Sequence, residues 1–272
     1  MQPRLRGIPE TLLIPLWARA AESAEIHPII RDPGAVRMLA EIDYDFARFG
    51  SARLSRWGVA VRTLLLDRAA QAFLERHPRA CVVNLGCGLD TRHMRLQHRD
   101  TLWYELDLPE SLMLRRRFFD ESPQYRFIAR SVFDTAWFDE VNAGNRPLLL
   151  IAEGLFMYFE EREIRALFSR MAGHFGGAEM LLEMQGPAIV GNSRRHDALR
   201  HMDDPPAFKW GTANDRAPET WHPGIRVLDV WRFFDQYPER MGWGGRLMRL
   251  PWLRPRFEPR ILRLQFPVKA LA

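Results

Sequence analysis

The sequence predicts an α/β protein built on a parallel, doubly wound sheet. Short apolar runs of strand length alternate with amphipathic helical patterns along the middle of the chain, and such alternation favours parallel pairing. A glycine-rich turn follows the first of these runs, and an aspartate ends the second. Together the three observations indicate a nucleoside-binding sheet whose ligand lies beyond the carboxyl ends of the strands.

The first third of the chain is expected to be helical. Residues 9–76 read as mostly helix, and residues 55–74 form the clearest part. The pair His77-Pro78 ends that helix, because a residue that precedes proline avoids the helical region.

The strand candidates are short apolar runs in the middle of the chain: residues 80–85, 101–108, 125–132, 148–153 and 179–184. The best helical pattern between them is residues 160–175, which has one apolar face. The alternating residues 260–266 are predicted to be a closing strand, and residues 228–237 a helix. Residues 187–224 contain five prolines and no clear period, which is typical of a lid or substrate segment.

Composition excludes several classes of protein. The 272 residues are 47% hydrophobic, which suits one domain with an elaboration. No run approaches the roughly 18 to 20 apolar residues that span a bilayer, and the first residues do not read as a secretory signal, so we expect a cytoplasmic protein without a membrane partner. The two cysteines, Cys81 and Cys87, form no CxxC pair, and no metal site is expected.

The formal charge of +5 does not by itself indicate nucleic acid. Only Lys209 and Lys269 are lysines among the 39 basic residues, a skew that suggests coding bias more than a binding face. The arginines are dispersed, apart from a cluster near the C-terminus: Arg246, Arg249, Arg254, Arg256, Arg260 and Arg263. We therefore expect a small-molecule partner and no nucleic acid, and the sequence does not indicate an oligomeric state.

The strongest functional pattern is VVNLGCGLDTR, residues 82–92. Glycines at 86 and 88 let a strand turn tightly into a helix and let a ligand approach the backbone closely. Asp107 ends the next strand nineteen positions after Gly88, a spacing typical of an acid that binds both ribose hydroxyls. The alternative for Asp107 is an N-cap ahead of Pro109.

Both NAD and S-adenosylmethionine are bound by this arrangement. Thr91 stands where the NAD pattern requires its third glycine, and Asp90 would repel a pyrophosphate. The acids Asp90 and Glu153 suit the ammonium and sulfonium of S-adenosylmethionine better. The sequence also lacks a Tyr-x-x-x-Lys dyad, which argues against an NAD-dependent oxidoreductase.

The segments 82–92, YELDLPE and IAEGLFMYF (residues 151–159) resemble the leucine carboxyl methyltransferase family, and most closely its bacterial polyketide branch. The resemblance covers about residues 9–185. It implies a class I S-adenosylmethionine-dependent methyltransferase fold, with a Rossmann-like seven-stranded sheet whose antiparallel strand is residues 260–266. It also implies four segments: a helical cover (1–78), a cofactor-binding core (79–186), an acceptor or lid segment (187–245) and C-terminal strands (246–272).

The resemblance assigns the methionine end of the donor to four residues. Arg62 matches an arginine that binds the methionine carboxylate, and Arg19 matches a second basic residue there. The carbonyl of Gly86 and the carboxylate of Glu153 match groups near the ammonium. The structural alternatives are that Arg62 is a solvated helix residue and that Glu153 caps the next helix.

Other positions carry weaker implications. Ser131 and Val132 match the pair beside the adenine, although the first of these is an aspartate in the eukaryotic branch. Tyr158 is interpreted either as an acceptor-side hydrogen-bond donor, the one catalytic candidate, or as a core tyrosine. Trp210 and Trp221 are interpreted as acceptor-pocket or anchoring residues.

The predicted function is an S-adenosylmethionine-dependent O-methyltransferase that esterifies a carboxylate of a small molecule such as a polyketide or another secondary metabolite. A phenol O-methyltransferase of the same fold is the first alternative, because no general base is evident from the sequence. A non-catalytic S-adenosylmethionine-binding protein is the second.

Overall fold

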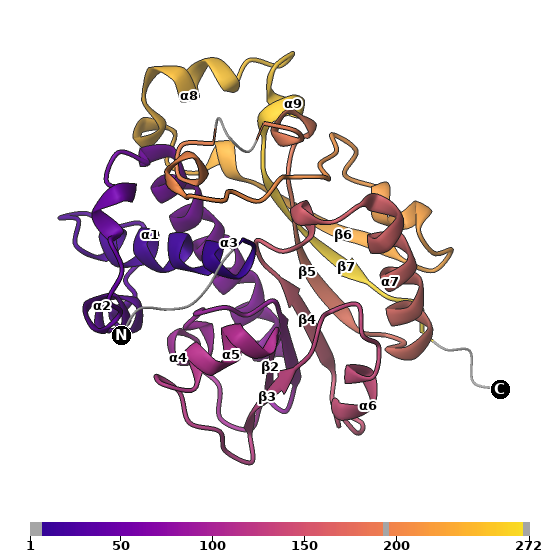
Figure 1. Cartoon of the computed structure of the whole chain (residues 1–272). Coiled ribbons are helices and arrows are strands. Elements are labelled where there is room, and N and C mark those ends of the chain that lie inside the picture. The colour runs from indigo at the N-terminus through magenta and orange to yellow at the C-terminus, as the bar shows by residue number, and fades with distance from the viewer. Residues whose placement is uncertain (1–6, 193–195, 269–272) are drawn as a thin grey trace.

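The computed structural model describes residues 7–192 and 196–268, and its centre is a seven-stranded sheet (Figure 1). The strand order is β3-β2-β1-β4-β5-β7-β6. The strands are β1 (Cys81–Leu85), β2 (Leu102–Asp107), β3 (Tyr125–Ala129), β4 (Leu148–Ala152), β5 (Glu179–Met184), β6 (Arg226–Arg232) and β7 (Arg260–Gln265). The first five strands pair in parallel, as the alternation of strands and helices predicts.

The chain reverses its direction of winding between β1 and β4, which are neighbours in the sheet. A crevice at such a switch point is where open α/β sheets bind ligands. Strand β7 lies antiparallel between β5 and β6, so the predicted antiparallel strand at 260–266 is confirmed within one residue of its end.

The helix predicted over residues 228–237 is wrong. Residues Arg226–Arg232 form β6, which pairs antiparallel with β7, and only a short 3₁₀ turn, Phe233–Asp235, follows it. The segment VLDVWRFF offers an apolar residue at almost every second or third position, and this pattern does not separate a helix from a strand. Pairing with β7 decides between them, because β7 satisfies the backbone groups on the inner side of this edge strand.

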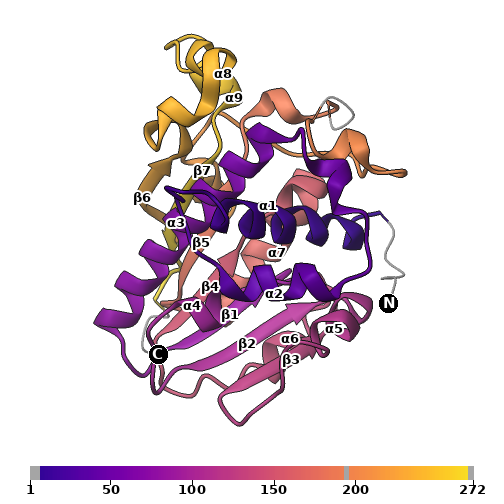
Figure 2. The ribbon, with the colours of Figure 1, turned by 90° about the vertical axis from the view of Figure 1, so that its left-hand side faces the viewer.

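Three N-terminal helices cover one side of the sheet (Figure 2). They are α1 (Leu13–Ser23), α2 (Pro33–Glu41) and α3 (Arg53–Arg76). Helix α3 extends the predicted 55–74 by two residues at each end and stops before His77-Pro78, as expected. Its apolar face packs on side chains from alternate positions of the strands, among them Val82 and Leu149.

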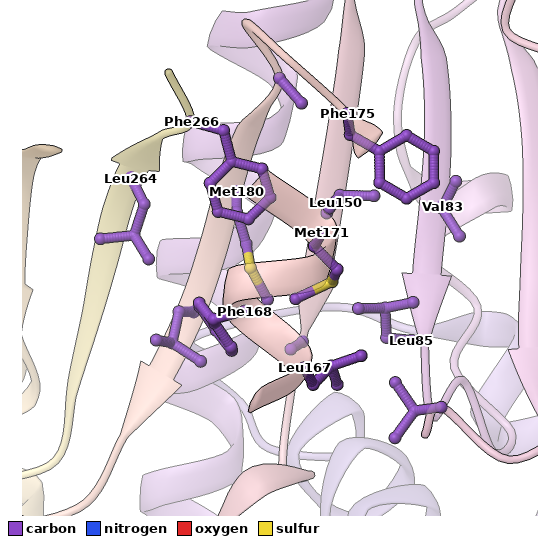
Figure 3. Packing of buried hydrophobic residues seen from close by; sticks show 14 of the residues in the cluster. Val83, Leu85, Leu150, Leu167, Phe168, Met171, Phe175, Met180, Leu264 and Phe266 are labelled. Carbon is purple, nitrogen blue, oxygen red and sulfur yellow. The ribbon is translucent and has the colours of Figure 1, made fainter. Parts of the chain in front are cut away.

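The opposite face of the sheet is covered mainly by α7 (Glu161–His174). Leu167, Phe168 and Met171 of this helix contact strand residues such as Val83 and Leu150 (Figure 3). Glu160 and Glu163 form a capping box that satisfies the first N–H groups of α7. The remaining helices are short: α4 (Arg92–Arg95), α5 (Pro109–Arg115), α6 (Trp137–Glu140), α8 (Gly242–Met248) and α9 (Arg254–Phe257).

The described part of residues 187–224 contains only 3₁₀ turns and irregular chain, in agreement with the absence of a period. Trp210 and Trp221 are buried against α7 and each other, with ring centroids 5.6 Å apart, so they anchor this segment to the core. The predicted segment boundaries at 78, 186 and 245 stay predictions, and residues 1–6, 193–195 and 269–272 of those segments lie outside the described residues. No helix in the described chain is long and apolar enough to cross a bilayer.

Candidate donor and acceptor site

A cavity of about 420 Å³ lies at the carboxyl ends of β1, β2, β4 and β5. Residues that end or follow these four strands line it: Gly86, Gly88, Asp90, Asp107, Glu153, Glu183 and Gln185. Helices α1 and α3 contribute further walls, and residues from 189 to 259 contribute others. The cavity therefore occupies the switch-point position that the sheet topology favours for a ligand.

The glycine turn forms the floor of this cavity. Gly86 and Gly88 both have positive φ values, +65° and +47°, which residues other than glycine rarely adopt. A Cβ at Gly86 would lie 2.8 Å from Cδ1 of Leu155, and one at Gly88 would lie 3.1 Å from Cβ of Leu12. The two glycines keep the backbone exposed to a ligand, as the sequence predicts.

Asp107 lies beside that turn. Its Oδ2 accepts the backbone N–H of Gly88 (2.7 Å), and its Oδ1 accepts the N–H of Leu108 (2.7 Å). Helix α5 has Leu108 as its N-cap and no side-chain cap, so the N-cap alternative for Asp107 is not adopted. Burial raises the pKa of this carboxyl, although hydrogen bonds from Gly88, Leu108 and the Ser111 side chain act to lower it. A carboxylate has about four acceptor positions, so these three bonds leave one for a ligand hydroxyl.

Arg62 is buried in the cavity wall between two carboxylates. Its Nε donates to Oε1 of Glu153 (2.8 Å), and its Nη1 donates to Oε2 of Glu183 (3.2 Å). Nη2 donates no hydrogen bond to any described residue, so one edge of the guanidinium is available to a ligand. The solvated-helix alternative for Arg62 is therefore wrong.

The pKa values of the two carboxyls beside Arg62 are shifted in opposite directions. Burial acts to raise the pKa of Glu153, but ion pairs with Arg62 and Arg92 outweigh it and hold the pKa below its usual value. Burial raises the pKa of Glu183, and the nearby charge of Glu153 raises it further. The single ion pair with Arg62 does not offset these effects, and Glu183 has no second arginine partner in the described chain. Glu183 thus accepts a proton more readily than Glu153 does.

A fully buried arginine, Arg92, forms ion pairs with carboxylates behind the cavity wall. It binds Asp67 (2.8 Å), Asp90 (2.7 Å) and Glu153 (2.6 Å). Asp90 lines the cavity, yet its oxygens already accept hydrogen bonds from Arg92, Arg95 and Asn84. Burial acts to raise the pKa of Asp90, but the two arginines outweigh it and keep the carboxyl ionised.

Arg19 reaches the cavity from α1. Its Nε donates to Asp32 (2.8 Å), and its Nη2 donates to the carbonyl of Leu89 (2.8 Å) at the end of the glycine turn. Arg19 and Arg62 thus line one cavity from two different helices, as the predicted pair of basic residues requires.

Much of the remaining cavity lining is apolar. Tyr158 is buried in this lining with its ring 5.4 Å from Phe208, its hydroxyl pairs with Thr11, and the charges of Arg62 and Glu183 also act on it. Burial raises the pKa of Tyr158, so its hydroxyl remains a hydrogen-bond donor at neutral pH. The apolar lining from the later part of the chain is Ile189, Leu199, Phe208, Phe233, Phe234, Met241, Met248 and Phe257.

Asp197 ties the segment after β5 to helix α3. Its Oδ2 accepts the backbone N–H groups of Leu54 (2.9 Å) and Ser55 (3.1 Å), and its Oδ1 accepts the Ser55 hydroxyl. These N–H groups belong to the first turn of α3, which has no capping side chain of its own at Ala52. Asp197 therefore caps α3 from 142 residues away in the sequence and holds the segment over the cavity.

Two predicted site residues are not brought to the cavity. Ser131 is exposed after β3, and Val132 is buried in the core, where its carbonyl accepts the indole N–H of Trp137 (2.9 Å). Neither lines the cavity, so their contact with adenine stays a prediction.

Glu183, Arg92 and Asp197 were not predicted from the sequence as site residues. Glu183 ends an apolar strand just as Glu153 does, and this shared pattern is a signal that could have found it. Arg92 stands within the glycine motif but was given no role. Nothing in the local sequence of Asp197 indicates that it caps a distant helix.

Comparison with known proteins agrees with this geometry. The family model for leucine carboxyl methyltransferases matches residues 13–172. The tetracenomycin polyketide synthesis O-methyltransferase TcmP of Streptomyces glaucescens is 34% identical over 270 residues, which cover 97% of this chain and 98% of that protein. The chain belongs to the leucine carboxyl methyltransferase family.

A second relative and a solved structure agree with this family membership and with the fold. The S-adenosyl-L-methionine-dependent methyltransferase dpfgK of Gibberella zeae is 30% identical over 270 residues, 90% of each chain. A crystal structure from Thermobifida fusca YX, described as a candidate methyltransferase, aligns with a TM-score of 0.54 at 15% identity and covers 92% of this chain and 94% of that one. At that identity the structural match supports the fold alone.

As a member of this family, the chain is an S-adenosylmethionine-dependent O-methyltransferase. The residues present fit that donor. The turn at Gly86 and Gly88 leaves a cradle that side chains would fill, and Asp107 keeps an acceptor position for a hydroxyl. The wall carries both acids and arginines for a ligand that bears an ammonium, a sulfonium and a carboxylate.

Proposed function

We propose that the enzyme transfers the methyl group to a carboxylate of a small, largely apolar molecule and releases a methyl ester. The observation that carries this proposal is the apolar lining of the cavity, to which eight side chains between 189 and 257 contribute alongside the acidic and basic wall. A pocket with a few convergent polar groups suits a small acceptor. A protein tail would need an open groove.

The nature of the acceptor is supported by the family and by the relatives. The family takes its name from carboxyl methylation, and TcmP takes its name from polyketide synthesis. We infer that the acceptor is a polyketide or another secondary-metabolite acid. A carboxylate is already ionised at neutral pH, so its methylation needs no general base.

The donor-binding roles follow from the contacts described above. We propose that Asp107 binds the two ribose hydroxyls, that Arg62 and Arg19 bind the methionine carboxylate, and that Glu153 and the carbonyl of Gly86 face the ammonium. The donor supplies a methyl group activated by a sulfonium. The chain's own contribution is to hold and align both reactants and to exclude water from them.

Tyr158 has the acceptor-side role in this proposal. Tyr158 lines the cavity and its hydroxyl stays protonated, so we propose that on acceptor binding it donates a hydrogen bond that orients the acceptor. Tyr158→Phe is expected to raise the KM for the acceptor and to leave donor affinity unchanged.

The test of the acceptor is chemical. The enzyme is incubated with donor labelled in its methyl group and with aromatic acids, and the product is then treated with mild base. Methyl esters release volatile labelled methanol, whereas aryl methyl ethers do not. A base-stable product would overturn the carboxylate proposal and leave the donor site as described.

A phenol is the second candidate because of Glu183. Burial raises the pKa of this carboxyl, which makes it a group that can accept the proton of a phenol. If the acceptor is a phenol, Glu183→Gln should abolish turnover at saturating donor. If it is a carboxylate, turnover at saturating donor should persist.

A further inference from the structure

Residues 240–257 form the edge of the cavity and also carry an unusual outer surface. Trp243 and Trp252 are 80% and 70% exposed, and Leu247 and Leu250 are exposed as well. Figures 1 and 2 show α8 at one end of the molecule, where it projects beyond the sheet. We call this surface the arginine–tryptophan face and define it by Trp243, Arg246, Leu247, Arg249, Leu250, Trp252 and Arg256.

The charge of this face is positive and is not compensated locally. Residues 240–257 contain five arginines and no acidic residue. Arg246, Arg249 and Arg256 are exposed and make no ion pair with any described residue. By contrast Arg254, in the same segment, is paired with Asp235 and Glu258 and helps to hold the segment on the body of the protein.

The same segment has an inner side. Met241, Met248 and Phe257 line the cavity, so one short stretch has residues that face the cavity and residues that face solvent. The buried positions of this stretch are thus occupied by other side chains, and the two tryptophans do not contribute to the core.

Exposed tryptophan and leucine beside unpaired arginines match the chemistry of an interface between lipid headgroups and acyl chains. The indole ring is apolar with one polar edge and is enriched at that depth, and guanidinium groups pair with lipid phosphates bidentately. We propose that the arginine–tryptophan face docks the enzyme on an anionic lipid surface. Such docking is peripheral and needs no spanning helix.

A lipid surface explains the face better than an acidic protein does. Four apolar side chains and three arginines are interspersed over fourteen consecutive positions at a projecting end of the molecule, which can enter a headgroup layer without steric conflict. Docking there would also bring the cavity edge close to the phase in which an apolar acceptor accumulates. The proposal does not depend on the acceptor's identity, because lipid binding is measured without donor or acceptor.

The first experiment is flotation of the full chain with vesicles. We expect strong association with vesicles of equal parts phosphatidylcholine and phosphatidylglycerol at low salt, and little with phosphatidylcholine alone. Replacing Arg246, Arg249 and Arg256 by Gln should weaken binding to anionic vesicles by roughly 100-fold, at about 1 kcal/mol per arginine.

A charge-matched control separates this face from general electrostatics. Arg37, Arg68 and Arg79 are exposed on α2, on α3 and before β1, and their replacement by Gln removes the same net charge elsewhere. The control variant should bind nearly as tightly as the wild type. Equal loss in both triple variants would overturn the proposal.

The second variant tests the apolar part. Trp243→Ala combined with Trp252→Ala should reduce vesicle binding at least tenfold and leave the melting temperature and the methyl transfer in solution unchanged, because both rings are exposed. Brominated acyl chains should quench tryptophan fluorescence of the wild type more than that of this variant. Absence of vesicle binding by the wild type, or binding to an acidic protein alone, would contradict the proposal.

Discussion

At the scale of single residues, the site is a set of charges that neutralise one another. Arg62 holds Glu153 and Glu183, and Arg92 holds Asp90 and Glu153. Buried charges are tolerated only when they are paired, and losing one member leaves the others uncompensated. The groups that we propose for ligand contact therefore include those with a free donor or acceptor, such as Nη2 of Arg62 and the remaining acceptor position of Asp107.

We predict that Asp107→Ala weakens binding of S-adenosylhomocysteine by about 1.5 to 3 kcal/mol, the usual range for hydrogen bonds to a charged group. Titration calorimetry measures the change. Asp100→Ala is the control, because Asp100 is exposed at the opposite end of β2. Unchanged affinity in Asp107→Ala would rule out the ribose assignment.

At the scale of elements, the segment after β5 depends on the contact between Asp197 and α3. The 24-residue helix begins without a capping side chain in its own sequence, and the distant carboxylate takes that place. Loss of the contact frees the N–H groups of Leu54 and Ser55 and releases the segment that lines the acceptor end.

We predict that Asp197→Ala lowers the free energy of unfolding by about 1 kcal/mol, the usual cost of losing an N-cap. It should also raise the acceptor KM more than the donor KM and speed limited proteolysis within 187–224. Asp197→Asn, which keeps a capping oxygen, should restore most of the loss, and Asp204→Ala, an exposed position in the same segment, should change nothing. Equal effects of the alanine variants at 197 and 204 would argue against the cap.

The same scale shows where sequence reasoning succeeds. The glycine turn, the five parallel strands and α3 were predictable because local composition and turn chemistry determine them. Strand β6 was not, since its run of mixed spacing is resolved only by its partner β7. Asp197 was not predictable for a similar reason: its role depends on a contact 142 residues away.

At the scale of the whole molecule, acid sensitivity adds a further test of the packing. His93 packs against Tyr125 and Trp103, and burial, aided by His98 and Arg115, lowers its pKa from about 6.5 to about 4. Between these values the unfolded chain binds a proton at this histidine that the folded chain does not. Stability therefore rises with pH across this window and falls as the pH decreases from 6.5 toward 4.

We predict that His93→Phe, which keeps an aromatic ring in the cluster, flattens the dependence of the melting temperature on pH between 6.5 and 4. The control His27→Phe alters an exposed histidine and should leave that dependence as it is in the wild type. The size of the effect is reduced because His93 is partly exposed. A His93→Phe curve parallel to the wild type would show that this ring is not the titrating group.

The central claim is that the donor lies in the cavity with its methionine carboxylate at Arg62. The most direct measurement is calorimetry of Arg62→Lys with two ligands, S-adenosylhomocysteine and 5′-methylthioadenosine, since the second lacks the carboxylate and the ammonium. Lysine retains the charge between Glu153 and Glu183 but loses the bidentate fork. We predict that affinity for S-adenosylhomocysteine falls by about tenfold or more while affinity for 5′-methylthioadenosine is unchanged. Equal losses for both ligands, or no loss for either, would contradict the account.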